Sequence, residues 1–270
     1  MPTDTLTSLA PLLGAGLAAG LVAGLLGVGG GIVMVPILSL VLPALGADEA
    51  VSMHMAVASS LAVIVLTSLV SARAHAKRGG VDLETARLWA LPIAAGALAG
   101  ALAARYLSGD ALRVLFAVLA AAVGTRFLLG RPAPEATLNW SRTLRRIAAT
   151  VIGVLSAWLG IGGGTFAVPV LHGVGLPMHR AVGTAALLGF FVALPGAIGF
   201  GISGLSVDGR LAHSVGYLHL PAVLVLASGA VLLAPVGARL AHAMPQLQLR
   251  RVFGVFLLLA AASMMSKALA

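Results

Sequence analysis

Long apolar runs, separated by short polar stretches, fill almost the whole chain. Most are close to the roughly twenty residues that a helix needs to cross the hydrocarbon core of a membrane. They do not alternate with period two, and they are longer than the strands of a membrane barrel. The pattern therefore predicts an all-α integral membrane protein. We expect ten segments, at residues 7–26, 28–45, 50–72, 87–107, 111–130, 147–161, 164–178, 181–203, 215–238 and 250–268.

Three consecutive glycines interrupt the apolar pattern twice, at Gly29–Gly31 and at Gly162–Gly164. In each copy a proline follows five residues later, at Pro36 and Pro169. Consecutive glycines can unwind a helix, because glycine adopts backbone angles that other residues avoid. A break that recurs in both halves of an apolar chain is the best sequence pointer to the binding site of a transporter.

The duplication extends beyond the glycines. The stretch that starts at His54 matches the one that starts at His179, and Val81-Asp82 matches Val207-Asp208. We therefore expect one transporter domain made of repeat 1 (residues 1–130), a linker (131–146) and repeat 2 (147–270). The first two segments of each repeat are either full spans or one re-entrant pair, which leaves between six and ten crossings.

Charge predicts how the repeats are oriented. Only 9% of the residues are charged, against about 25% in a soluble domain. With the 73–87 loop placed in the cytoplasm, the odd number of segments per half puts the linker there too. Then 13 of the 17 basic residues lie inside, and four lie outside (Arg105, Arg113, Arg210 and Lys267). Basic residues favour the cytoplasmic side, so both termini are expected outside, in a multi-pass protein of the cell inner (plasma) membrane. The repeats would then have inverted topology, as in many secondary transporters.

Several classes of function are disfavoured by composition. The chain has no cysteine, which excludes disulfides and thiolate metal sites. No nucleophile–base pair or metal-ligand cluster is apparent, so we expect neither enzymatic activity nor a metal or cofactor. The net charge of +9 does not indicate nucleic-acid binding, since there is no basic helix and no aromatic platform. All eight carboxylates fall in expected loops or segment ends, whereas buried carboxylates are typical of cation pathways. An anionic or neutral substrate is therefore favoured.

The candidate substrate-binding residues are glycines and hydroxyls. An unwound turn exposes backbone N–H groups, and the positive end of the next helix begins there, so two such turns can form a cradle for an anion. Hydroxyl groups can add donors without charge. The alternatives are that the glycines only permit tight packing, and that the hydroxyls bond to their own helix. The candidates are Gly29, Gly30, Gly31, Gly162, Gly163 and Gly164 at the breaks, and Ser59, Ser60, Thr165 and Thr184 nearby.

His54 and His179 are paired ionisable residues, each shortly before a candidate hydroxyl of its repeat. Histidine changes charge near neutral pH, so either could relay protons or attract an anion. The alternative is a solvated histidine at the membrane interface.

Smaller signals concern packing and the interface. Glycines four residues apart permit close helix contact, as at Gly16, Gly20 and Gly24 and again at Gly96 and Gly100. Three aromatic residues at segment ends, Trp89, Tyr106 and Tyr217, are expected at the membrane–water interface.

The motif pair resembles the TauE/SafE family of sulfite and organosulfonate permeases. The matching stretches are Gly27-Val28-Gly29-Gly30-Gly31 with Pro36, and Gly160-Ile161-Gly162-Gly163-Gly164-Thr165 with Pro169. The stretches from His54 and His179 are similar to the family's His-x-Ala-Val-Gly-Thr-Ser pattern, and residues 77–82 are similar to its loop after the third segment. The first repeat departs with Ala58-Ser59 where Gly-Thr is usual, and the second with Ala185 where Ser is usual. The resemblance covers nearly the whole chain and implies an inner-membrane transporter of small sulfur-containing anions.

The hypothesis is a secondary transporter that exports sulfite, organosulfonates or related anions by alternating access around a midplane site. Its partners would be the small anion and the lipid bilayer. An anion channel is the alternative, as is a transporter of another small anionic or neutral solute. The sequence leaves the oligomeric state open, with a homodimer as one candidate.

Overall fold

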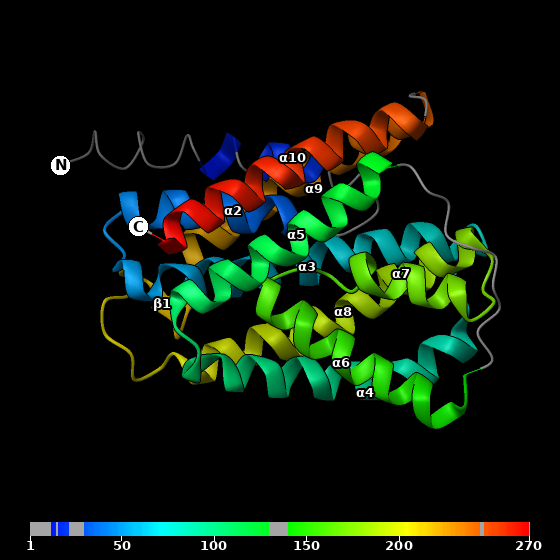
Figure 1. Cartoon of the computed structure of the whole chain (residues 1–270), viewed down its shortest axis with the longest axis horizontal. Helices are drawn as coiled ribbons and strands as arrows, with labels where there is room; N and C mark the ends of the chain where they lie inside the picture. Colours follow the sequence, from blue (N-terminus) through cyan, green and yellow to red (C-terminus); the bar gives the residue numbers. More distant parts are fainter. Residues whose placement is uncertain (1–11, 15, 22–29, 130–139, 244–245, 270) are drawn as a thin grey trace.

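The described part of the chain is almost entirely helical (Figure 1). The computed structural model describes residues 12–14, 16–21, 30–129, 140–243 and 246–269. Residues 12–14 and 16–21 are helical and precede α2 (Gly31–Ala44), α3 (Glu49–Ala76), α4 (Leu83–Ala103) and α5 (Gly109–Leu129). The second half contains α6 (Arg142–Leu159), α7 (Gly164–Gly173), α8 (Met178–Ser203), α9 (Leu220–Ala243) and α10 (Gln246–Leu269). The turn η1 (Ala104–Tyr106) follows α4, and a hairpin of β1 (Ser214–Val215) and β2 (Leu218–His219) leads into α9.

Four of the described helices are long and apolar enough to cross a membrane. They are α3, α4 with η1, α5 and α8. In contrast, α2 and α7 have 14 and 10 residues and rise only about 21 and 15 Å. Neither reaches across a hydrocarbon core of about 30 Å by itself. The long helices make this an all-α, multi-pass membrane protein, and the short ones follow directly on the two glycine breaks.

The helices run lengthwise between two ends of the molecule, with α3 against α8, α4 against α6, and α5 against α10 (Figure 1). At one end, which we call the linker end, Arg180 Nη1 lies 3.6 Å from Asp82 Oδ2, so the start of α8 meets the residue that caps α4. At the other, the hairpin end, Asp48 N–H donates to Gly209 O (3.0 Å), which joins the loop before α3 to the loop before the hairpin. These contacts bring the chain before α4 and the start of α8 together at one end, and the loops before α3 and before the hairpin together at the other.

Small residues allow the helices to approach closely, as predicted. A Cβ added at Gly16 would lie 2.8 Å from Leu226 O, and one at Gly100 would lie 3.0 Å from Val154 Cα. At Gly20 and Gly96 an added Cβ would collide with the backbone of the facing helix, at Ala230 and at Thr150 respectively. Backbone-to-backbone packing of this kind favours helix association in membranes. Gly24 lies outside the described residues.

The expectation of interfacial aromatic residues is wrong for two of the three. Tyr106 is exposed, but Trp89 is fully buried and Tyr217 is 4% exposed. Trp89 shares one face of α4 with Ile93, Ala97 and Ala101, which recur every four residues and are all buried inside the protein. The position of Trp89 on that face, rather than its position near the segment end, decides its environment.

Candidate functional site

The second glycine break ends one helix and begins another. Gly160 follows the last residue of α6 with φ +63°, a left-handed conformation that glycine adopts without strain. Ile161 N–H then donates to Ser156 O (3.0 Å) and closes the helix end, as is common where a helix stops at glycine. The chain turns over Gly162 and Gly163, and α7 begins at Gly164. In the first repeat the left-handed glycine, Gly30 with φ +73°, directly precedes α2, whereas Gly163, which precedes α7, has φ −54°. Gly29 lies outside the described residues.

The two breaks touch each other. A Cβ added at Gly31 would collide with Gly160 O and lie 3.1 Å from Ile161 Cα. A Cβ added at Gly160 would lie 2.9 Å from Val57 Cα of α3 and 2.7 Å from Val35 Cγ2 of α2. The start of α2, the second break and the middle of α3 therefore form one buried junction, which we call the glycine centre. Gly30, Gly31 and Gly160–Gly164 are all buried there.

Hydrogen-bond donors gather at the glycine centre. The first N–H groups of a helix have no acceptor within that helix, and they carry its positive dipole end. Among the residues that the structure describes, no carbonyl accepts from the N–H groups of Gly162, Gly163 or Gly164. The Ser156 and Thr165 hydroxyl oxygens are likewise buried without a described hydrogen-bond partner. Chemically, this arrangement can donate several hydrogen bonds to a small anion.

Ser60 is a further candidate hydroxyl at the glycine centre, in addition to Thr165. It is fully buried, and its Oγ donates to Gly160 O (2.8 Å), which ties α3 to the second break. The bond satisfies a carbonyl that the helix end leaves without an intrahelical donor. In this structure Ser60 therefore holds the break in position.

Ser59 and Thr184 make a different kind of contact. The Ser59 Oγ accepts from His219 N–H (3.2 Å), and the Thr184 Oγ1 accepts from Asp82 N–H (2.9 Å). Both hydroxyls are fully buried, and neither bonds to a carbonyl of its own helix. Each one instead connects the third helix of one half to the other half of the chain.

These two contacts are reciprocal. Asp82 directly precedes α4, and His219 directly precedes α9. The hydroxyl on α8 thus binds the residue before α4, while the hydroxyl on α3 binds the residue before α9. Asp208, the residue matched to Asp82 by sequence, lies instead before the hairpin that leads into α9.

The two candidate histidines lie in different environments. His54 is 4% exposed at the hairpin end, with Nε2 3.1 Å from the carbonyl oxygens of both Ala104 and Leu107. Its ring stacks on Tyr217 with 4.9 Å between ring centroids, and its Nδ1 is buried without a described hydrogen-bond partner. His179 is exposed near the loop that contains Gly80. A proton relay through either residue stays a prediction.

Sequence reasoning missed Ser156, and it expected Tyr217 at the membrane interface rather than stacked on His54. Ser156 lies in the last turn of α6, four residues before Gly160, and that spacing could have identified it. Tyr217 and His219 have no comparable signal, because they reach α3 only through the fold. Among the described residues no group of His, Asp and Glu could hold a metal ion.

Asp82 gives a prediction about pH. Its side chain accepts from Thr85 N–H (2.8 Å) at the start of α4, and this bond is the main reason that the pKa of Asp82 is lower than that of an ordinary carboxyl group, with a smaller effect from Arg180. Because the pKa is lower in the folded state, the associated stability is complete above the ordinary pKa and is lost as pH falls through the lowered one.

We expect Asp82→Asn to keep the helix cap but remove this acid-dependent loss, since asparagine caps about as well as aspartate. Asp82→Ala should cost about 1 kcal/mol at neutral pH, because the cap itself is lost. Thermal unfolding in detergent from neutral pH down to about pH 3 measures both. An Asn variant that loses stability with acid as steeply as the unmodified protein would contradict the assignment.

Comparison with known proteins identifies relatives along nearly the whole chain. Residues 12–264 match the family model described as "Sulfite exporter TauE/SafE". A "Probable membrane transporter protein" of Haemophilus influenzae is 32% identical over 264 residues, covering 97% of this chain and 99% of the relative. The "Probable membrane transporter protein YunE" of Bacillus subtilis is 29% identical over 217 residues, covering 73% of this chain and 80% of the relative. A "Probable membrane transporter protein" of Methanocaldococcus jannaschii is 24% identical over 265 residues, covering 95% and 97%. No solved structure matches the chain closely enough to be counted as similar.

Proposed function

Since the chain belongs to the sulfite exporter TauE/SafE family of membrane transporters, we propose that it exports sulfite, an organosulfonate or a related small sulfur-containing anion across the inner membrane. The anion would bind at the glycine centre. The observation that carries this proposal is the contact between Gly31 and Gly160, which unites both glycine breaks in one buried site. The N–H groups of Gly162–Gly164 and the hydroxyls of Ser156 and Thr165 would donate to the oxyanion.

Inverted repeats are the second part of the proposal. The reciprocal Ser59–His219 and Thr184–Asp82 contacts support it, because a pseudo-twofold axis would exchange them. So does the packing of the fifth helix of each half: Gly124 of α5 faces Gly254 of α10, and the two helices run in opposite directions (Figure 1). Such repeats typically rock around a fixed site near the membrane midplane.

Electrostatic arguments support an orientation of the protein in the membrane and a direction of transport for the anion. The linker end carries most of the described basic side chains, among them Arg73, Lys77, Arg78 and Arg180, which favours its placement in the cytoplasm. With the membrane potential negative inside, export of an anion is favoured by about 2.3 kcal/mol per charge per 100 mV. Export therefore needs no coupling ion, whereas uptake would.

The test is counterflow in liposomes with the purified protein. Vesicles loaded with unlabelled sulfite should transiently accumulate labelled sulfite above its external concentration, and the initial rate should saturate with substrate. A short sulfonate inside should replace sulfite in driving this exchange, while a neutral sugar should not. Non-saturating flux without counterflow would point to a channel, and exchange driven equally by neutral solutes would refute the anion site.

A further inference from the structure

One face of α3 changes from apolar to basic towards the linker end. Leu66 and Val70 are 48% and 52% exposed, and Arg73 and Lys77 continue the same face at helical spacing. From Leu66 to Lys77 the helix rises about 16 Å. That is close to half of the roughly 30 Å hydrocarbon core. The face thus has the length and the polarity profile of one membrane leaflet.

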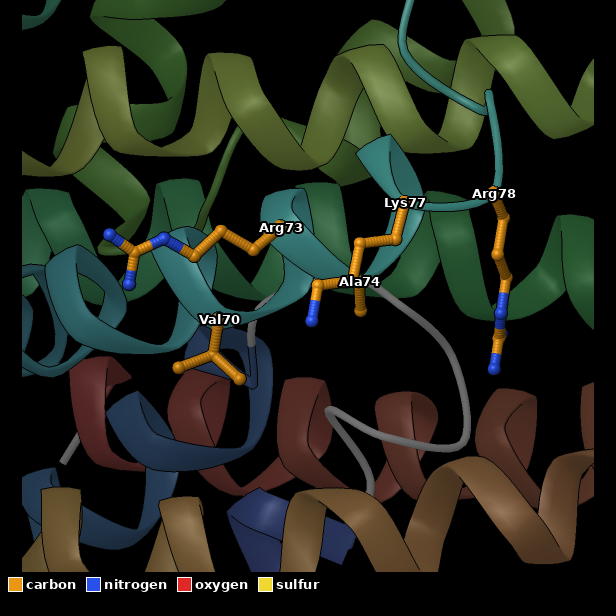
Figure 2. A pocket seen from close by; sticks show the side chains of 5 residues that line it. All are labelled: Val70, Arg73, Ala74, Lys77 and Arg78. Carbon is orange, nitrogen blue, oxygen red and sulfur yellow. The ribbon is translucent and has the colours of Figure 1, made fainter.

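A hollow of about 370 Å³ lies at the basic end of this face (Figure 2). It is lined by Val70, Arg73, Ala74, Lys77 and Arg78. Figure 2 shows the side chains of Val70, Lys77 and Arg78 directed to the same side of α3, while Arg73 extends alongside the helix. The volume is within the range of small-molecule sites, which starts at about 300 Å³. The hollow is therefore large enough for a phosphate group with part of a glycerol.

The three cations that line the hollow have no carboxylate partner among the described residues. The described ion pairs of arginine involve Arg113 and Arg180, and no described carboxylate lies within 4.0 Å of Arg73, Lys77 or Arg78. Guanidinium groups match the geometry of phosphate oxygens, and an ammonium adds a compact charge. Long basic side chains that only extend to the membrane surface would need no shared hollow.

We propose that this hollow, the α3 phosphate site, binds the headgroup of an anionic phospholipid whose acyl chain lies along Leu66 and Val70. A free oxyanion shares the phosphate chemistry, but it would not use the exposed apolar half of the face. Basic pockets between membrane helices on the cytoplasmic side bind the headgroups of anionic lipids. The site is distinct from the glycine centre and does not depend on the transported substrate.

The test compares three ligands on the purified full-length protein in detergent, with binding measured by native mass spectrometry. Phosphatidylglycerol should bind more tightly than phosphatidylcholine, and inorganic phosphate should compete for the site only weakly. Arg73→Gln with Lys77→Gln should weaken phosphatidylglycerol binding by about thirtyfold, since each cation near the membrane surface contributes roughly a fivefold factor. Arg142→Gln with Arg146→Gln, which removes the same charge from exposed positions on α6, is the matched control and should leave that affinity unchanged.

Two results would overturn the site. Equal losses in the hollow and control variants would show that overall charge, not the hollow, attracts the lipid. Inorganic phosphate that displaces phosphatidylglycerol at comparable concentration would assign the hollow to a soluble anion instead. Because the readout is lipid affinity, neither result bears on the substrate of the glycine centre.

Discussion

Replacing Gly31 by alanine is expected to abolish transport. The added Cβ collides with Gly160 O, a backbone atom that cannot rotate away, and it would lie 2.7 Å from Ile64 Cδ1. Forcing an extra methyl group into a packed junction typically costs about 1–3 kcal/mol. We expect the clash to push the two glycine breaks apart. The N–H donors of the second break would then no longer be held in place against the start of α2. Counterflow in liposomes measures the loss, and membrane fractionation with thermal unfolding measures insertion and stability.

The matched control is Gly14→Ala, the same change at a helical glycine where an added Cβ meets nothing within 4 Å. It should leave transport and stability close to those of the unmodified protein, since alanine is the better helix former. At Gly163 the loss of anion binding should grow with the size of the introduced side chain. An added Cβ makes ordinary contacts, the nearest at 3.5 Å to Gly189 N, so Gly163→Ala should fold, whereas Gly163→Leu should abolish anion binding. Full transport by Gly31→Ala would show that the junction opens freely during the cycle.

The segments, the glycine breaks and the packing glycines could all be predicted from sequence, because each depends on local composition. A run of apolar residues predicts a helix wherever it packs, and a glycine repeated every four residues marks one helix face. Helix ends were less accurate: α6 begins at Arg142, inside the expected linker, because Ser141 caps it by accepting from Leu144 N–H. The cap residue was visible in the sequence, but the apolar pattern starts later.

The partners of the candidate hydroxyls could not be predicted. Ser59, Ser60 and Thr184 are expected to contact an anion, and in the structure each also bonds to a backbone group distant in sequence. A hydroxyl satisfies a buried peptide group and an oxyanion with the same chemistry, so residue type cannot distinguish these roles. Only the fold brings Asp82 to Thr184 and His219 to Ser59. Their roles in binding stay predictions, and the structure adds a second role for each.

The reciprocal contacts lead to the other large prediction, that Ser59→Ala and Thr184→Val shift the protein in opposite directions. Each change leaves an N–H without its acceptor: the buried N–H of His219 in the first case, and the partly buried N–H of Asp82 in the second. An unpaired buried donor costs about 1–3 kcal/mol. Under alternating access, that cost would fall on the state in which the affected end is closed. Ser59→Ala should then favour opening at the hairpin end and Thr184→Val opening at the linker end, each by about 5- to 150-fold in population.

The absence of cysteine makes this measurable, because one introduced thiol reports one position. Ala56→Cys on α3 and Ala181→Cys on α8 place a thiol at two fully buried positions, three residues before each hydroxyl. Ser59→Ala should speed labelling at position 56 by a maleimide and slow it at 181, and Thr184→Val should do the reverse.

Ser68→Ala is the control, since the Ser68 Oγ donates to Val65 O in its own helix and its bond does not connect the two halves of the chain. The double variant should restore the balance at lower overall stability, because the two contacts share no residue and their costs add. If both single variants instead speed labelling at the same end, the contacts do not act as opposed closures, and the rocking of two halves around the glycine centre loses its main structural support.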